Sequence, residues 1–162
     1  MAETTQLVPL LRAHEGSEWK PEEPAPEEEL VGVERKLERR LQEAYRQLFP
    51  YADGGSLHGA QARIFFYPLR DLPEFNTGAD ASPGLAGMLV FADDEGDFIY
   101  YFDPDNRLRR GAWAVYVVEK ALAGFEHSMF VAEDVVRVCR RVLDGENIFD
   151  APYVGDESQN AE

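Results

Sequence analysis

The sequence has little cysteine and no long apolar run, and each shortage excludes a class of protein. Its single cysteine, Cys139, cannot build an internal disulfide framework and is typical of a reducing compartment. Residues 1–5 lack the basic region and the apolar stretch of a signal peptide. No apolar stretch approaches the roughly 20 residues that span a bilayer. We therefore expect a soluble protein of the cytoplasm.

Basic residues are also scarce, with 16 Lys and Arg against 31 Asp and Glu, which gives a net charge of −15. Phosphate binding needs clustered Lys and Arg, so nucleic acid and anionic membranes are excluded as partners. The three arginines at 107–110 form too small a patch to change this. An acidic surface would attract a basic protein, such as a nucleic-acid-binding protein, but solubility explains the charge equally well.

Catalytic motifs are missing as well. There is no Gly-x-Ser-x-Gly, no His-Glu-x-x-His and no phosphate-binding glycine loop. His14, His58 and His127 are far apart and match no metal-ligand spacing. Cys139 lies on the apolar stripe of a predicted helix, where a buried, inert thiol is expected. The sequence therefore predicts no catalysis, no bound metal and no cofactor.

What the chain does have is one clear structural pattern, at residues 88–103. A continuous apolar run over 88–92 is typical of a strand buried on both faces. Residues 93–97 place four carboxylates around one glycine, which indicates a tight turn. From 97 to 103 the aromatic residues follow the two-residue period of a strand. The segment predicts a β-hairpin around which the other elements are arranged.

The flanking segments predict further elements. Apolar residues at three- and four-residue spacing favour helices at 27–48 and 131–143. Residues rich in β-formers favour strands at 63–69 and 113–118. Residues 70–87 are predicted to be a loop with little regular structure, and 119–130 fit no single element. Short turns between successive strands favour antiparallel neighbours. We therefore expect an α+β fold, an antiparallel sheet of four or more strands packed by helices.

With 162 residues the chain has room for one domain with a proper core. We expect an N-terminal extension at 1–18, the domain at 19–150 and a polar, disordered tail at 151–162. Trp19 stands in a polar setting and is expected to fill a surface groove.

The carboxylates of the hairpin turn are the strongest site candidates. Paired carboxylates can transfer protons or hold a divalent cation, but this turn lacks the ligand layout of a calcium loop. A turn that faces solvent or a partner is the favoured interpretation. Asp103 and Asp105 form a second Asp-x-Asp pair, which turn capping explains adequately. Any aromatic side chains exposed on the sheet would be natural anchors for a partner. The candidate partner-binding residues are Asp93, Asp94, Glu95, Asp97, Tyr101, Asp103 and Asp105.

A set of motifs follows in one order between Trp19 and Phe149. In chain order they are Glu34, Leu41 and Tyr45, then Asp53-Gly54-Gly55, Tyr67-Pro68-Leu69, Gly96-Asp97, Asp103, Val115-Tyr116 and the late helix from Val131. The ordered set resembles the SUKH superfamily, whose founding members are the SMI1/KNR4 cell-wall regulators. The chain departs from the family at Gln42, where proline is usual, and at 1–18 and 119–130, which match nothing distinctive.

The resemblance implies a function as well as a fold. Bacterial members are mostly immunity proteins that bind and neutralise toxin domains, many of them nucleases, and no catalysis is implied. We therefore expect a cytoplasmic immunity protein that occludes a basic toxin domain. The alternative is a scaffold or regulatory interaction module without a toxin. In the first case we expect the acids of 93–97 to steer the partner toward the protein.

Overall fold

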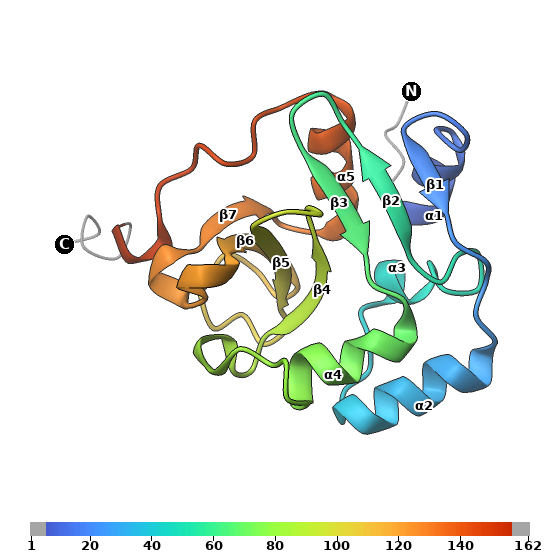
Figure 1. Cartoon of the computed structure of the whole chain (residues 1–162), viewed down its shortest axis with the longest axis horizontal. Helices are drawn as coiled ribbons and strands as arrows, with labels where there is room; N and C mark the ends of the chain where they lie inside the picture. The colour runs from blue at the N-terminus through green and yellow to red at the C-terminus, as the bar shows by residue number, and fades with distance from the viewer. Residues whose placement is uncertain (1–5, 157–162) are drawn as a thin grey trace.

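The computed structural model describes residues 6–156, and these are built on one twisted antiparallel sheet (Figure 1). Within them seven strands follow one another in chain order across the sheet, and every neighbouring pair is antiparallel. The strands are β1 (Trp19–Pro21), β2 (Gly55–His58), β3 (Arg63–Phe66), β4 (Leu89–Asp93), β5 (Phe98–Asp103), β6 (Ala114–Glu119) and β7 (Met129–Ala132). The predicted α+β fold with an antiparallel sheet is confirmed.

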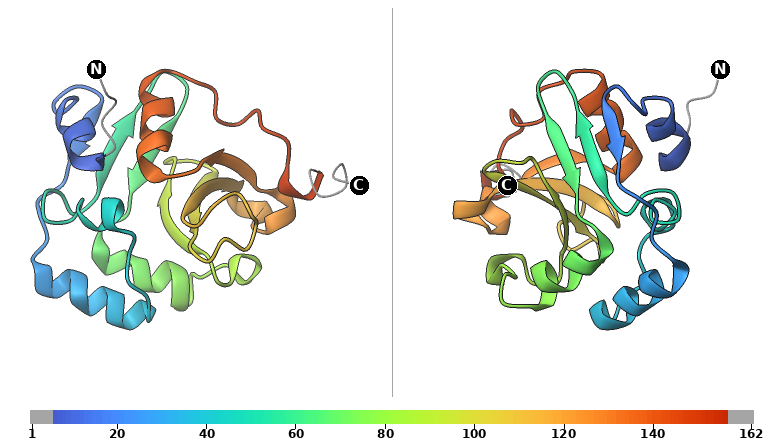
Figure 2. Two further views of the ribbon diagram at one scale, coloured as in Figure 1. Left: turned by 180° about the vertical axis from the view of Figure 1, so that it is seen from behind. Right: turned by 45° about the vertical axis from the view of Figure 1, so that its right-hand side comes forward.

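Helices cover one face and one end of this sheet. The α-helices are α1 (Leu7–Arg12), α2 (Glu27–Leu37), α3 (Glu43–Arg46), α4 (Leu72–Thr77) and α5 (Val135–Leu143). Single 3-10 turns are η1 (Leu69–Asp71), η2 (Pro83–Leu85), η3 (Lys120–Leu122) and η4 (Phe125–His127). In Figure 1, α1, α3 and α5 lie behind the sheet, and they come forward when the molecule is seen from behind (Figure 2). Helices α2 and α4 lie together at one end, where α4 contacts β4.

The central hairpin of β4 and β5 forms the middle of the core, as the sequence predicts. Phe91 of β4 stacks on Phe102 of β5, with ring centroids 4.0 Å apart. Tyr45 of α3 covers both rings at 5.5 and 5.1 Å. All three side chains are fully buried. Burial of each of these rings stabilises the folded protein by on the order of 2 kcal/mol.

The predicted long helix at 27–48 is wrong, because the chain breaks into α2 and α3. Glu38 ends α2 in the left-handed region at φ 53°. Leu41 N then donates to Glu34 Oε2 at 2.8 Å, which fixes the turn, and the Gln42 side chain caps α3 by accepting from Tyr45 N. The break turns Tyr45 onto the sheet, which a straight helix would not do.

The N-terminal segment is part of the core. Trp19 is fully buried in β1 and contacts Phe66 edge-on at 5.9 Å, so its predicted place in a surface groove is wrong. Leu7 and Leu11 of α1 are buried in the same core cluster. Gly55 opens β2 at φ 147°, where an added Cβ would lie 2.6 Å from the Trp19 ring and the Lys20 carbonyl. The first five residues lie outside the described residues.

Three further expectations change after β3. Residues 70–87, predicted as irregular, contain α4 and the single turns η1 and η2. The undecided segment 119–130 holds two 3-10 turns and the start of β7, and Val131 belongs to that strand and not to the last helix. Val154 N donates to Ser128 O at 2.8 Å, so the predicted disordered tail is wrong over 151–156. Residues 157–162 of that tail lie outside the described residues.

Cys139 is fully buried on α5, where burial and the nearby charge of Asp134 raise the pKa of its thiol. Because only the thiolate reacts, we expect the native protein to resist a disulfide reagent such as dithionitrobenzoate over an hour. One thiol per chain should react within minutes in guanidinium, which serves as the control. Stoichiometric labelling of the native protein would contradict the prediction.

None of the helices between residues 6 and 156 has the length and apolar character that a membrane span requires.

Candidate protein-binding face

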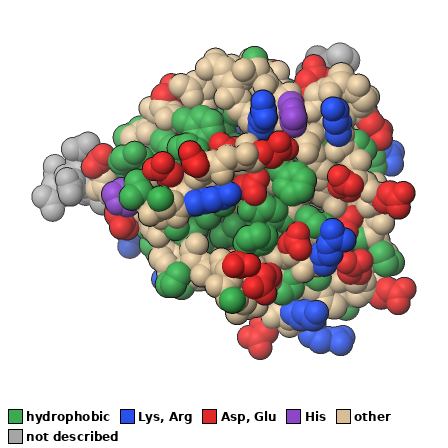
Figure 3. Space-filling view, viewed as in Figure 1, with side chains coloured by type: hydrophobic (Ala, Val, Ile, Leu, Met, Phe, Trp, Pro, Cys, Tyr) green, Lys and Arg blue, Asp and Glu red, His purple; other side chains and the backbone are tan. Residues whose placement is uncertain are grey.

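The face of the sheet opposite α1, α3 and α5 carries a hollow, which we call the front hollow. Its volume is about 290 Å³. Its lining is Tyr67, Phe75, Asp80, Ser82, Val90, Asp93, Ile99 and Lys120. In the space-filling view hydrophobic side chains gather in the middle of this face, with acidic side chains around them (Figure 3). The hollow therefore combines an apolar floor with a charged rim, the combination found in many protein interfaces.

Two stacked rings belong to the apolar part of the front hollow, beside Val90 and Ile99. Tyr67 follows β3, Phe75 belongs to α4, and their ring centroids are 4.5 Å apart with planes inclined by 19°. The Asn76 side chain fixes α4 on the sheet, because it donates to Val90 O at 2.9 Å and accepts from Val90 N at 2.7 Å. Both rings are therefore held by the fold before any partner arrives.

Of the four predicted turn carboxylates, two hold the hairpin together. Asp93 accepts a hydrogen bond from Tyr67 Oη at 3.1 Å and one from Glu95 N at 2.8 Å. Asp94 accepts from Gly96 N and Phe98 N at 2.8 and 3.1 Å. Burial and the charge of Asp93 raise the pKa of the Tyr67 hydroxyl, which therefore stays protonated. Asp93 also lines the front hollow, whereas Asp94 serves the turn.

The other two carboxylates of the turn point outward. Glu95 is in the left-handed region at φ 63°, and its carboxylate lies 3.6 Å from His58 Nε2 and 3.9 Å from Arg63 Nη1. Asp97 is exposed. The fold therefore leaves Glu95 and Asp97 on the surface, where a partner could meet them.

Two predicted partner residues are not on the surface. Tyr101 is fully buried, stacks on Tyr116 at 5.4 Å and donates to Ser128 Oγ at 2.6 Å. Asp103 is also fully buried, and its carboxylate accepts from Arg107 N and Leu108 N at 2.9 and 2.8 Å. As partner contacts these two assignments are corrected: Tyr101 anchors the segment before β7, and Asp103 holds the loop after β5.

Asp105, the last predicted site residue, is exposed but paired. Its two carboxylate oxygens accept from Arg39 Nη1 and Nη2 at 3.1 and 2.9 Å. The hydrogen bonds and charge of Arg39 lower the pKa of Asp105. This pair joins the loop after β5 to the turn after α2, and neither residue lines the front hollow.

Sequence reasoning missed the aromatic part of the site. The sequence points to Tyr67 only through the family motif, and it predicts that Phe75 lies in an irregular loop. The signal was present in part, since Leu72, Phe75 and Asn76 have helical spacing and Pro73 stands in the first turn of α4, where proline is tolerated. No local pattern could bring Phe75 onto Tyr67, because the contact depends on how α4 packs against β4.

The described residues offer no arrangement of metal ligands. No group of three or more His, Cys, Asp or Glu side chains within residues 6–156 is placed to hold a metal ion. Cys139 is buried on α5. The absence of catalysis, metal and cofactor remains a prediction for the whole chain.

The comparison with known proteins agrees with the ordered motifs. No curated protein matches the sequence. The model of the SMI1 / KNR4 family (SUKH-1) matches residues 24–137, which is more than half of the chain and includes β2 to β7 and the front hollow. The chain therefore belongs to the SMI1/KNR4 family (SUKH-1).

Proposed function

We propose that this protein is a non-catalytic immunity protein of the cytoplasm that binds a toxin domain and neutralises it by occlusion. The observation that carries the proposal is the front hollow, an accessible apolar depression held in place by the fold and bordered by carboxylates. Family membership supports a role in protein binding. The toxin partner itself is inferred from what the resemblance implies about bacterial members.

Charge supports a basic partner. The protein carries −15 overall, and Asp80, Glu95 and Asp97 are exposed at or near the front hollow. A nuclease domain has to present cationic side chains to its nucleic-acid substrate, so its active surface would be complementary. Covering that surface would block the substrate without any chemistry on the part of the immunity protein.

The direct test is co-expression with candidate toxin domains, beginning with those encoded next to this gene. We expect one of them to stop killing its host when this protein is present, and the two proteins to purify as a complex. A complex with a non-toxic regulatory protein, and no protection from any neighbouring toxin, would favour the scaffold alternative instead.

The acids of this face should act mainly on the rate of association, because exposed charges govern encounter more than residence. We expect the double variant Asp80→Lys and Asp97→Lys to bind the toxin with an association rate roughly tenfold lower at low salt. Its association rate should also depend less on salt. Stopped-flow fluorescence at two ionic strengths measures both quantities.

The matched control changes the net charge equally but elsewhere. Glu28 on α2 and Asp144 at the end of α5 are exposed and do not line the front hollow. The variant Glu28→Lys and Asp144→Lys should therefore keep a larger share of the association rate. Equal slowing by both variants would mean that only net charge matters and that the front face is not the site of encounter.

A further inference from the structure

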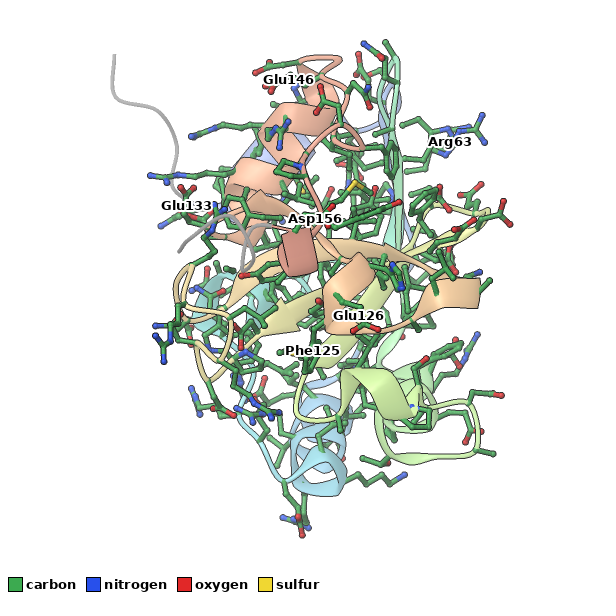
Figure 4. All side chains as sticks on the ribbon, turned by 90° about the vertical axis from the view of Figure 1, so that its left-hand side faces the viewer. Arg63, Phe125, Glu126, Glu133, Glu146 and Asp156 are labelled. Atoms are coloured by element: carbon green, nitrogen blue, oxygen red, sulfur yellow. The ribbon has the colours of Figure 1, made fainter. Side chains whose placement is uncertain are left out.

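A second hollow, which we call the tail hollow, lies beside the described end of the chain and takes no part in the site above. Its volume is about 320 Å³. The apolar side chains Leu122, Phe149 and Tyr153 line it together with the carboxylates of Glu119, Asp150 and Asp156. Figure 4 faces this side and labels Asp156 together with Glu126 of η4.

The tail hollow is held in place by the segment after α5. Tyr153 pairs with Met129 in an antiparallel bridge, and Val154 N donates to Ser128 O at 2.8 Å. The Phe149 ring packs on Phe98 of β5 with centroids 4.8 Å apart. These contacts join the lining to the sheet, so a ligand would find it already ordered and binding would cost less entropy.

Its apolar side chains are unusually exposed. Among residues 6–156 the exposed large hydrophobic residues are Val31 at 39%, Leu122 at 42% and Tyr153 at 42%. Two of the three therefore line one hollow, although scattered single residues would be ordinary on a soluble protein. Grouped exposed apolar residues within a polar rim are typical of interaction sites.

The charge of the rim selects the kind of ligand. Among the described residues that line the tail hollow there are three carboxylates and one histidine, His127, but no Lys or Arg, whereas the front hollow contains Lys120. Three carboxylates around an apolar floor favour an apolar side chain that is flanked by cations, and they disfavour an acidic segment because like charges repel in close approach.

We infer that the tail hollow is a docking site for a segment of a partner protein in which an aromatic or long aliphatic side chain is flanked by Lys or Arg. The apolar side chain packs between Leu122 and Tyr153, and the cations face Glu119, Asp150 and Asp156. The identity of the partner, the toxin domain, rests on the proposed function, but the chemistry of the docked segment does not.

Three blocked synthetic peptides test this chemistry without any toxin. The probe is KRWLRK, and the controls are KRSGRK, which lacks the apolar pair, and EEWLEE, which reverses the charge. Each is titrated into the full-length, nitrogen-15-labelled protein, and backbone amide shifts are followed by NMR. We expect KRWLRK alone to give saturable shifts concentrated at the amides of Leu122, Met129 and Tyr153.

Variants then separate docking from general attraction. Leu122→Ala together with Tyr153→Ala should weaken KRWLRK binding about tenfold, because truncation of anchoring side chains typically has such an effect. Val31→Ala removes an equally exposed apolar side chain on α2 and should leave the affinity within twofold. Native amide spectra of each variant establish that the fold is retained.

Each result decides the inference independently of the toxin. Shifts at the tail hollow with KRWLRK that are lost in the Leu122 and Tyr153 variant support it, even if no toxin is ever neutralised. Equal shifts with KRSGRK, shifts elsewhere only, or no shifts at millimolar peptide would overturn it. Neutralisation of a toxin by the same double variant at wild-type affinity would leave the proposed function intact and remove this docking site from it.

Discussion

Replacing Asp103 by alanine is expected to lower the free energy of unfolding by about 2–4 kcal/mol, since two backbone N–H groups in a partly buried loop lose their only carboxylate partner. Those groups are Arg107 N and Leu108 N, at 2.9 and 2.8 Å from the Asp103 oxygens. Urea denaturation followed by tryptophan fluorescence measures the loss. Trp113 lies at the far end of the same loop, where its N–H donates to Asp103 O at 2.7 Å.

The effect should be large because several residues of the loop after β5 are held in unfavourable backbone conformations. Asn106, Arg109 and Trp113 have φ values of 56°, 68° and 66°, a region that non-glycine residues occupy at a cost. The Asp103 carboxylate supplies two of the hydrogen bonds that offset this cost, and the hydrogen bond from Gly111 N to Asn106 Oδ1 would remain. The loss of order in the loop should extend to Trp113 and to Phe102, whose ring centroids are 5.2 Å apart.

Two variants control this prediction. Asp103→Asn keeps one acceptor oxygen and should lie between wild type and alanine, because only one of the two hydrogen bonds is lost. Asp105→Ala removes an exposed carboxylate two residues away and should change stability little, since exposed ion pairs contribute little. If Asp103→Ala and Asp105→Ala have the same stability, the buried carboxylate does not hold the loop.

The second large effect is expected at Glu34, which joins α2 to α3. Its carboxylate accepts from Leu41 N at 2.8 Å and from Arg46 Nε at 3.1 Å, and Arg46 Nη2 also donates to it at 3.1 Å. The side chains of Glu34 and Arg46 are only 12% and 16% exposed. Replacing Glu34 by alanine should lower the free energy of unfolding by about 2–3 kcal/mol, because Leu41 N loses its acceptor and a largely buried guanidinium keeps only its second, more exposed partner, Glu27.

The contribution of the Glu34 carboxylate to the free energy of unfolding should decrease at acid pH. Burial raises the pKa of Glu34, but the hydrogen bonds from Arg46 and Leu41 more than offset this, so the pKa falls below its ordinary value of 4.5. A carboxyl with a depressed folded pKa stabilises the protein fully above the unfolded pKa, and the stabilisation is lost as pH falls through the folded pKa. The stability difference between wild type and Glu34→Ala should therefore be constant near pH 7 and shrink below pH 4.5.

A control comes from the same region of the fold. Glu43→Gln removes an exposed carboxylate whose ion pair with Arg40 has a distance of 3.6 Å and side chains 62% and 70% exposed. It should have a small effect at every pH. A stability difference for Glu34→Ala that grows toward acid pH would show that the sign of the linkage is wrong.

Sequence alone determined the parts of this protein whose secondary structure is specified by residues close together in the chain. The hairpin of β4 and β5 follows from an apolar run, a turn rich in Asp and Gly, and an alternating strand, so its two strands were located to within a residue or two. Strand β6 and the body of α5 follow from equally local periodicity. The order of motifs along the chain was sufficient to identify the family, because it requires no knowledge of contacts.

Only the tertiary structure decided where the helices break and which side chains reach the surface. Leu41, Tyr45 and Leu48 continue the spacing of α2, yet the chain turns at Glu38 because Glu34 reaches Leu41 N and Arg46, contacts that no periodicity encodes. Tyr101 and Asp103 are polar and looked accessible, but the segment before β7 and the loop after β5 cover them. The two hollows are also products of packing, because each gathers residues from elements far apart in sequence. Local propensity specifies an element; burial, and with it the site, is specified by what other elements pack upon it.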